Sequence, residues 1–216
     1  MKHHNKENCE SLLQARKLFA QECKFILGAV HFSQVPNRPQ DEVAFAGRSN
    51  VGKSSLVNAL VGQKSLAHSS TSPGRTRQLN FFDVGARLTL VDLPGYGYAR
   101  APRSELASWT RLVQEYLGSR GNLRRVCLLV DARRGLMDND LSVMSLLDEA
   151  AVSYLIVLTK TDKIDGVDLR DQMGTGSASI AKRPAAYPSV VATSARFGSG
   201  IDELRLALAP LAQPKI

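Results

Sequence analysis

Gly47-Arg48-Ser49-Asn50-Val51-Gly52-Lys53-Ser54 is the stretch that decides the fold. It fits the pattern G-x-x-x-x-G-K-[ST] of a phosphate-binding loop. The apolar run Glu42 to Ala46 precedes it and predicts a buried strand, and Lys53 to Leu60 continues with apolar residues at helical spacing. In this strand–loop–helix context, the backbone N–H groups of the loop and the helix N-terminus can bind phosphate. The alternative is a Gly/Ser turn that only precedes a helix. The stretch predicts a nucleotide site, with Lys53 on the β- and γ-phosphates and Ser54 on Mg²⁺.

A second segment predicts the metal-binding carboxylate. The apolar run Leu88 to Val91 ends at Asp92-Leu93-Pro94-Gly95. Alone, this sequence is as consistent with an ordinary turn as with a metal site. After a phosphate loop, however, a carboxylate at a strand end is suited to hold Mg²⁺ through water. Gly95 has no side chain, so its N–H can approach a γ-phosphate closely.

A third segment predicts the base. Thr159-Lys160-Thr161-Asp162 follows the apolar run Ser153 to Leu158. The Asp162 carboxylate can accept hydrogen bonds from guanine N1–H and the exocyclic amine, two donors that adenine does not offer there. We expect the Lys160 stem to lie against the base. The more familiar first residue of this motif is Asn, so Thr159 puts the tether between this loop and the phosphate loop in doubt.

Two further segments are weaker signals. Thr193-Ser194-Ala195 follows the run Ser189 to Ala192, and its backbone would contact the guanine carbonyl. The polar, turn-rich connector Ser69 to Arg77 contains Thr76, the candidate switch threonine that would close on Mg²⁺ and the γ-phosphate. Thr71 or another hydroxyl of the connector is the alternative.

The position after Gly95 holds Tyr96, where many small GTPases carry a glutamine that orients the attacking water. A phenol lacks the paired donor and acceptor of an amide. We therefore expect slow hydrolysis of GTP that a partner or an ion accelerates. In some related GTPases an Asn at the position of Asn50 ligates a potassium ion, so K⁺ is a candidate cofactor beside Mg²⁺; the alternative is that Asn50 only shapes the phosphate loop. Arg75 or Arg77 is a further candidate to contact the phosphates.

The motifs resemble those of the EngB family of bacterial GTPases, within the Era/TrmE-like P-loop GTPases. Residues 72–82 (Ser-Pro-Gly-Arg-Thr-Arg-Gln-Leu-Asn-Phe-Phe) and 92–99 (Asp-Leu-Pro-Gly-Tyr-Gly-Tyr-Ala) carry the resemblance, which spans about residues 16–211. It implies a GTPase, converting GTP and water to GDP and phosphate, that assists assembly of the large ribosomal subunit. Some members of the family have been linked to cell division and septation.

The predicted site has three sets of residues. The catalytic set is Lys53, Thr76 and Gly95, and the metal set is Ser54, Thr76 and Asp92. The nucleotide contacts are Gly47, Arg48, Ser49, Asn50, Val51, Gly52, Lys53, Ser54, Gly74, Arg75, Thr76, Arg77, Gln78, Asp92, Leu93, Pro94, Gly95, Thr159, Lys160, Thr161, Asp162, Thr193, Ser194 and Ala195.

Strand and helix patterns alternate along the chain, which predicts an α/β fold with three layers, a mainly parallel six-stranded sheet and helices on both faces. We expect an N-terminal extension at 1–40, a GTPase domain at 41–212 and a tail at 213–216. The extension carries an amphipathic helix with apolar residues at Leu12, Ala15, Phe19, Cys23 and Ile26. Met173 to Pro184, with its small and polar residues and a basic end, is expected to be mobile. Helices are expected at Glu105–Leu117 (with Leu106, Trp109, Val113 and Tyr116 inward), after Asp138 and after Gly200.

Composition agrees with a cytoplasmic, nucleic-acid-linked protein. The 216 residues carry a net charge of +8, and Tyr98 to Arg134 holds eight arginines against three acidic residues. Such a basic face suits the rRNA backbone, although a solvated helix surface is the alternative. The three cysteines lack metal spacing, which favours reduced thiols. No signal peptide or membrane-spanning run is visible, and a monomer is expected.

Other classes of function stay open. A P-loop ATPase or small-molecule kinase would share the phosphate loop, but Asp162 argues against adenine. A signalling or trafficking GTPase would usually carry glutamine in place of Tyr96 and a lipidation motif. Within guanine-nucleotide proteins, the alternative is a GTPase that acts on another RNA or a cell-division partner without binding the ribosome.

Overall fold

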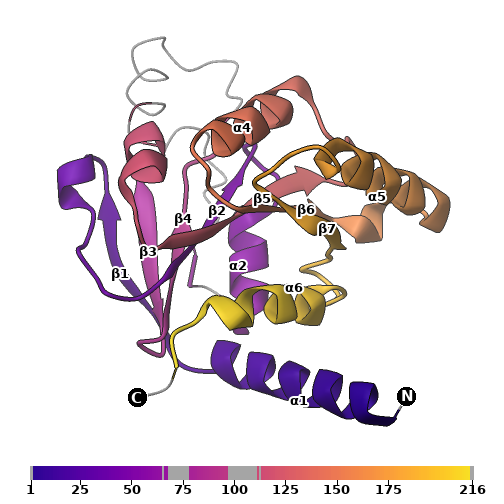
Figure 1. The fold of residues 1–216 in the computed structure, drawn as a ribbon, viewed down its shortest axis with the longest axis horizontal. Helices are drawn as coiled ribbons and strands as arrows, with labels where there is room; N and C mark the ends of the chain where they lie inside the picture. The colour runs from indigo at the N-terminus through magenta and orange to yellow at the C-terminus, as the bar shows by residue number, and fades with distance from the viewer. Residues whose placement is uncertain (1, 65, 68–77, 97–110, 112, 215–216) are drawn as a thin grey trace.

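The computed structural model describes residues 2–64, 66–67, 78–96, 111 and 113–214, with side chains from residue 8 onward. A seven-stranded sheet lies at the centre of this part (Figure 1). Its strands are β1 (Cys23–Ala29), β2 (Glu42–Gly47), β3 (Leu79–Val84), β4 (Leu88–Asp92), β5 (Leu123–Asp131), β6 (Tyr154–Thr159) and β7 (Ala186–Ala192).

The order across the sheet is β1-β3-β4-β2-β5-β6-β7. The pairs β1/β3 and β3/β4 are antiparallel, and the other four pairs are parallel. The predicted mainly parallel α/β sheet is therefore confirmed, but the predicted number of six strands was one too low.

The additional strand is β1, at the antiparallel edge of the sheet. Helix α1 (Lys2–Phe19) ends four residues before it, so Cys23 and Ile26 do not belong to the predicted amphipathic helix. The apolar spacing of this segment suits a helix, but pairing with β3 and an edge-to-face contact between Phe25 and Phe82 determine its conformation. The ladder contains an irregularity between Phe25 and Leu27, as is common at sheet edges.

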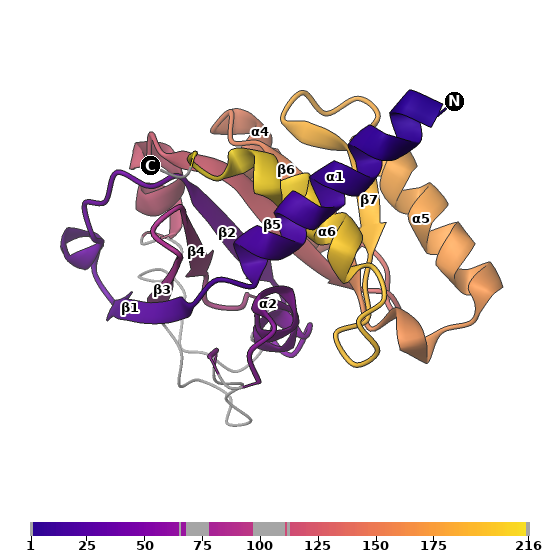
Figure 2. The same ribbon diagram turned by 90° about the horizontal axis from the view of Figure 1, so that it is seen from below.

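Helices cover both faces of the sheet (Figures 1 and 2). The helices α1, α2 (Lys53–Val61) and α6 (Ile201–Leu208) lie on one face, where α1 crosses α6. On the other face lie α4 (Asp138–Glu149), α5 (Gly166–Ile180) and helical turns at residues 113–119. In the described part of the chain, one-turn 3-10 helices connect elements at η1 (Phe32–Gln34), η2 (Thr161–Lys163) and η3 (Ala209–Leu211).

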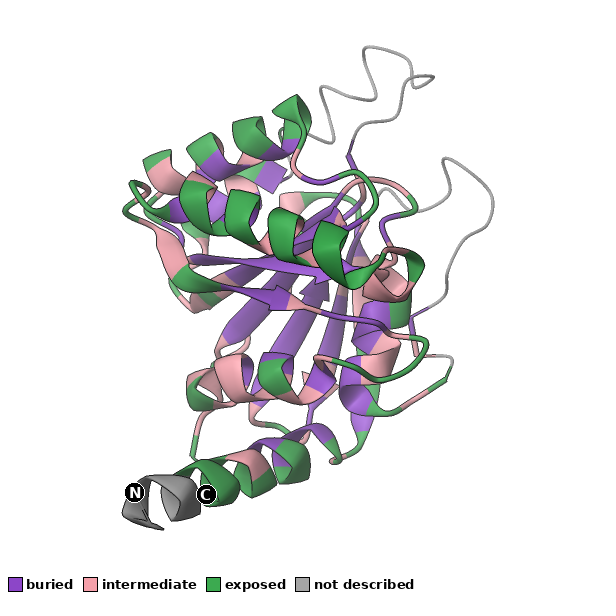
Figure 3. Cartoon of the chain, turned by 90° about the vertical axis from the view of Figure 1, so that its right-hand side faces the viewer, coloured by how far each residue is buried: buried purple, intermediate pink, exposed green. Residues whose placement is uncertain are grey.

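Figure 3 shows the sheet buried between these two layers. The predicted inward residues Val113 and Tyr116 are buried on one face together with Met144 of α4, and Ile201 of α6 is buried on the other. Leu106 and Trp109 lie outside the described residues. A hydrophobic core on each face of the sheet holds the parallel strands in place. The loops at the carboxyl ends of these strands are positioned by them.

The prediction that Met173–Pro184 is mobile was wrong, because most of this segment belongs to helix α5, which ends at Ile180. The carboxylate of Asp165 caps the helix by accepting hydrogen bonds from the N–H groups of Val167 and Asp168. The helix then continues to Ile180 despite its Gly, Ser and Thr content. A Cβ at Gly176 would lie 3.1 Å from Val190, so a small residue there allows close packing on β7.

Candidate functional site

The predicted site segments converge at one edge of the sheet. The parallel strands β4, β2, β5, β6 and β7 have their carboxyl ends there, and all the placed segments except Gln78 directly follow a strand. After β2 the chain continues into β3 and β4 on one side and later into β5 on the other. This reversal of strand order creates the crevice in which open α/β sheets bind ligands.

The phosphate loop has the backbone that its sequence predicts. Gly52 adopts φ 104° and directly precedes α2, which begins at Lys53. Asn50 has φ 63°, a left-handed conformation that is unusual for a residue with a side chain. A Cβ at Gly47 would lie 2.9 Å from Val51 and 3.0 Å from Leu129. The loop is therefore closely packed against the core, with the free N–H groups of α2 at its end.

The Lys53 ammonium donates a hydrogen bond to the Asp92 carboxylate. The Lys53 and Asp92 side chains are 13% and 7% exposed, so the pair lies largely out of water. Ser54 follows as the second residue of α2. A cation, a carboxylate and a hydroxyl residue thus meet at the N-terminus of a helix. Among the described residues, no cluster of three or more His, Cys, Asp and Glu side chains could hold a metal ion by itself.

The segment after β4 is held directly to the phosphate loop. The Leu93 N–H donates to the Phe45 carbonyl at 3.0 Å. Further along, the Tyr96 N–H donates to the Gly47 carbonyl at 3.2 Å, and the Ser49 N–H donates to the Tyr96 carbonyl at 3.1 Å. A Cβ on Gly95 would lie 3.1 Å from the Ser49 backbone nitrogen. Glycine therefore allows the closest approach of these two loops.

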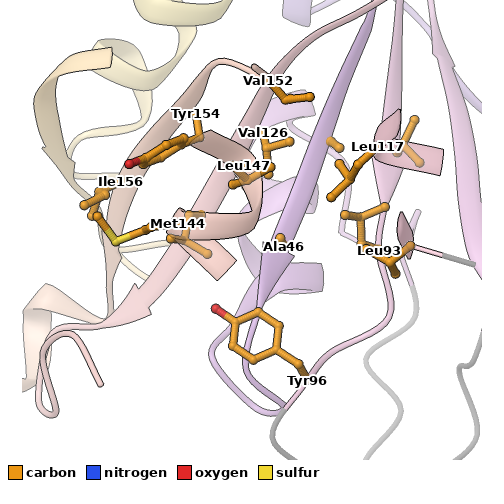
Figure 4. Packing of buried hydrophobic residues seen from close by; sticks show 14 of the residues in the cluster. Ala46, Leu93, Tyr96, Leu117, Val126, Met144, Leu147, Val152, Tyr154 and Ile156 are labelled. Atoms are coloured by element: carbon orange, nitrogen blue, oxygen red, sulfur yellow. The ribbon is translucent and has the colours of Figure 1, made fainter. Parts of the chain in front are cut away.

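The Tyr96 side chain is directed into the protein. Its ring lies among apolar residues that include Ala46 and Leu93 (Figure 4), and its hydroxyl donates to Asp140 Oδ1 at 2.7 Å. The second oxygen of this fully buried carboxylate accepts the Met137 N–H at 3.0 Å. Burial, together with the Asp140 charge, raises the pKa of Tyr96 far above its ordinary value. In this conformation the phenol is bound to α4.

The loop predicted to bind the base, Thr159–Asp162 (the base loop), is tied to the phosphate loop although Thr159 replaces the familiar Asn. The Thr159 hydroxyl lies 2.7 Å from the Val51 carbonyl oxygen, to which it donates. Both residues are buried. Lys160 makes a second link, because its ammonium donates to the Asn50 carbonyl at 2.6 Å. The tether that the sequence left in doubt is therefore present in another form.

Asp162 is held by the loop that follows β7. The Ser194 hydroxyl donates to Asp162 Oδ1 at 2.7 Å, and the Phe197 N–H lies 3.3 Å from the Ser194 oxygen. The Thr161 N–H donates to the Thr193 carbonyl at 3.2 Å. The hydrogen bond from Ser194 lowers the pKa of Asp162 below its ordinary value, so the carboxylate is an acceptor at neutral pH. Ser194 thus contributes its side chain, whereas the sequence predicted a backbone role.

Some predicted residues are not brought to this edge. Gly74, Arg75, Thr76 and Arg77 lie outside the described residues. Gln78 is placed, but its side chain lies against Gly28 of β1 and donates to Asn80 at 2.9 Å.

Asp131, which ends β5 and contacts Lys160 at 2.9 Å, is absent from the predicted site residues. Its position at a strand end, equivalent to that of Asp92 on β4, was the available signal.

Most of the described arginines of the basic stretch have partners within the protein. Arg120 pairs with the buried Glu42, and Arg125 donates to the Ala207 carbonyl and lies over the Tyr187 ring. These two arginines serve the fold. Among the described residues of the stretch, the exposed arginines are Arg111, Arg124, Arg133 and Arg134, of which the first three pair with neighbouring carboxylates. A basic face for nucleic acid would therefore be smaller than the sequence suggested.

Comparisons with known proteins agree with this geometry. Residues 42–160 match the family model described as 50S ribosome-binding GTPase. The chain is 52% identical to a probable GTP-binding protein EngB of Rhodospirillum rubrum, over 96% of this chain and 92% of the relative. It is 50% identical to a protein of the same name from Bradyrhizobium diazoefficiens, over 93% of each chain.

Solved structures show the same fold. A crystal structure of a probable GTP-binding protein EngB matches with a TM-score of 0.64 and 22% identity, over 79% of this chain and 97% of the other. Era in complex with MgGDPNP and 16S ribosomal RNA matches with a TM-score of 0.63 and 21% identity, over 83% and 59%. The fold is that of the P-loop GTPases, and the identity to its relatives shows that the chain belongs to the EngB family of GTP-binding proteins.

Proposed function

We propose that this protein is a guanine-nucleotide switch that hydrolyses GTP slowly and, in its GTP form, docks on the large ribosomal subunit. The observation that carries the nucleotide part is the position of Asp162. Ser194 holds it ionised, in a base loop that Thr159 and Lys160 tie to the phosphate loop. An ionised carboxylate only accepts hydrogen bonds, so it suits the two donors on the guanine edge and not adenine. By joining the two loops, this network would set the spacing between base and phosphate.

The residues of the phosphate loop would bind the phosphates. Lys53 now neutralises Asp92 and would exchange this partner for the β- and γ-phosphate oxygens. The backbone N–H groups of Gly52, Lys53 and Ser54 would face the same oxygens, because they stand at the start of α2. The Gly95 N–H would approach the γ-phosphate, for which the missing side chain leaves room.

Mg²⁺ fits the residues present. The Asp92 carboxylate and the Ser54 hydroxyl are hard oxygen donors, and Mg²⁺ usually takes one or two protein ligands, with water and phosphate oxygens completing its shell. When bound, the ion neutralises negative charge on the β- and γ-phosphates. Thr76, the third predicted ligand, lies outside the described residues and stays a prediction, as does a potassium ion at Asn50.

Slow hydrolysis is proposed from the position of Tyr96. Where a glutamine would orient the attacking water, this chain has a phenol whose hydroxyl donates to Asp140. A group engaged in that hydrogen bond does not orient water at the γ-phosphate. A partner or an ion would therefore supply what the site lacks.

The ribosomal partner is proposed from the family and from charge. The matching family model is described as ribosome-binding, and the net charge is +8. Two exposed arginines of the basic stretch, Arg111 and Arg124, form single-contact ion pairs of the weak, solvent-screened kind. They can therefore exchange carboxylates for phosphates, with an affinity that falls as salt rises. No described helix is long and apolar enough to cross a membrane.

The test is co-sedimentation with purified large ribosomal subunits across a salt series, with GDP and with a non-hydrolysable GTP analogue. We expect tighter binding with the analogue that weakens steeply with salt. Arg134→Gln removes an exposed basic charge and should reduce the salt slope, whereas Lys17→Gln on α1 is the matched control. No binding in either state, with intact guanine-nucleotide affinity, would leave another RNA or a cell-division protein as the partner.

A further inference from the structure

Asp131 lies in a network that the nucleotide motifs do not include. It ends β5 and is paired in register with Thr159 at the end of β6. Its side chain is 10% exposed and contacts two cations, Arg133 and Lys160. We propose that Asp131 is a positioning residue for guanine-nucleotide binding, which acts by holding the Lys160 ammonium over the phosphate loop. This inference rests on the proposed function.

Arg133 orients the Asp131 carboxylate. The guanidinium donates Nε to Oδ1 at 2.9 Å and a terminal nitrogen to Oδ2 at 2.7 Å, and the Arg133 backbone N–H donates to Oδ1 at 3.1 Å. Such a two-pronged contact fixes the plane of a carboxylate. Oδ2 is then the oxygen that faces Lys160, whose ammonium donates to it at 2.9 Å.

The charge of this carboxylate is maintained by its partners. Burial raises the pKa of Asp131, but hydrogen bonds from Arg133 and Lys160 outweigh that effect and leave the pKa well below its ordinary value. The carboxylate therefore stays ionised and retains its attraction for the Lys160 ammonium at neutral pH. Asp131 cannot release Lys160 by taking up a proton under these conditions.

The ammonium that Asp131 holds also joins two strained residues. Among the described residues, four other than glycine have positive φ, and Asn50 at 63° and Lys160 at 58° are two of them. They are bonded to each other through the Lys160 ammonium and the Asn50 carbonyl at 2.6 Å. Backbone strain of this kind, about 1–3 kcal/mol per residue, persists only where surrounding contacts enforce it.

The path of the Lys160 stem follows from these two anchors. The ammonium bonds Asn50 on one side and Asp131 on the other, and the stem passes close to Gly52, where a Cβ would lie 3.5 Å from Lys160 Cε. Without Asp131, a lysine side chain has several rotamers of similar energy. Losing this anchor would free both the Lys160 stem, which is expected to lie against the base, and the Asn50 carbonyl of the phosphate loop.

The expected change in GDP affinity on removing the Asp131 charge is opposite in sign to that expected from charge alone. Removing a negative charge beside a phosphate site should, by charge alone, strengthen binding of an anionic nucleotide. If Asp131 acts by positioning Lys160, Asp131→Asn should instead weaken GDP binding about tenfold, which is an ordinary size for coupling between contacting groups. The loss should be visible as faster release of a fluorescent GDP analogue.

The test is a double-mutant cycle on the full chain, measured by GDP titration and by release kinetics. Lys160→Met keeps the apolar stem and removes the ammonium. Asp131→Asn should weaken GDP binding about tenfold in the wild type and less than twofold in the Lys160→Met background. Asp138→Asn, at an exposed carboxylate on α4, is the charge-matched control and should change nothing.

Three outcomes would overturn the proposal. Unchanged or tighter GDP binding by Asp131→Asn means that the carboxylate has no positioning role. An equal loss in the Lys160→Met background means that it acts through another group or through stability, which thermal melting of each variant monitors. A wild type that binds no guanine nucleotide removes the proposed function, and this inference with it.

Discussion

Replacing Thr159 with Val tests whether a hydroxyl takes over the tether that the familiar Asn provides. Valine keeps the branched shape of threonine and removes only the donor. The Thr159 hydroxyl reaches the Val51 carbonyl at 2.7 Å, and the two residues are 4% and 3% exposed. Water is therefore not available to replace the lost hydrogen bond.

The expected cost follows from that burial. A buried acceptor that loses its donor costs about 1–3 kcal/mol. For a chain of this size, 1 kcal/mol corresponds to about 2–4 °C in melting temperature. We therefore expect Thr159→Val to lower the free energy of unfolding by about 2 kcal/mol and the melting temperature by about 4–8 °C. GDP release should also accelerate, since the base loop and the phosphate loop lose a link.

The assay is urea unfolding with and without GDP, and Thr159→Ser is the matched control. Serine retains the hydroxyl and loses a methyl group, so it should retain most of the stability and the slow GDP release. A serine variant that is as unstable as the valine variant would refute the reasoning, because packing and not the hydrogen bond would then explain the loss.

Two further predictions concern buried side chains, namely the Tyr96 phenol and the thiols of Cys23 and Cys127. Tyr96→Phe removes the donor to the fully buried Asp140 carboxylate and should destabilise the fold by about 1–3 kcal/mol, measured by urea unfolding; an unchanged midpoint would contradict the hydrogen bond. Burial raises the pKa values of Cys23 and Cys127 to about 12, so both are neutral thiols at pH 8. Iodoacetamide should therefore label the exposed Cys9 alone in the native protein and all three cysteines in urea, as counted by mass spectrometry. Labelling of Cys127 at the rate of Cys9 would disprove its burial.

The parallel strands and their loops were predictable because both signals are local. A parallel strand covered on both faces is a continuous apolar run, as in Glu42–Gly47 and Tyr154–Thr159. Phosphate binding needs glycines and a lysine at fixed offsets, and base recognition needs a carboxylate after a strand. Each of these requirements is visible within ten residues of sequence.

Contacts between distant residues were not predictable in the same way. Thr159 and Val51 are 108 positions apart, and Lys160 and Asp131 are 29 apart, so neither link appears in a local pattern. Cys23–Ala29 became an edge strand because β3 offered a partner. The small and polar residues of Met173–Pro184 indicated mobility, but Gly176 instead allows helix α5 to approach Val190.

The most direct test of the guanine assignment is to measure GDP, ADP and XDP affinities of the wild type and of Asp162→Asn. The wild type should bind GDP more tightly than ADP by about 10⁴-fold, because ADP would leave Asp162 unpaired. Asparagine can donate to the 2-carbonyl of xanthine, so the variant should lose GDP affinity and gain XDP affinity. An Asp162→Asn variant that retains wild-type GDP affinity, or a wild type that binds ADP as tightly as GDP, would contradict the account.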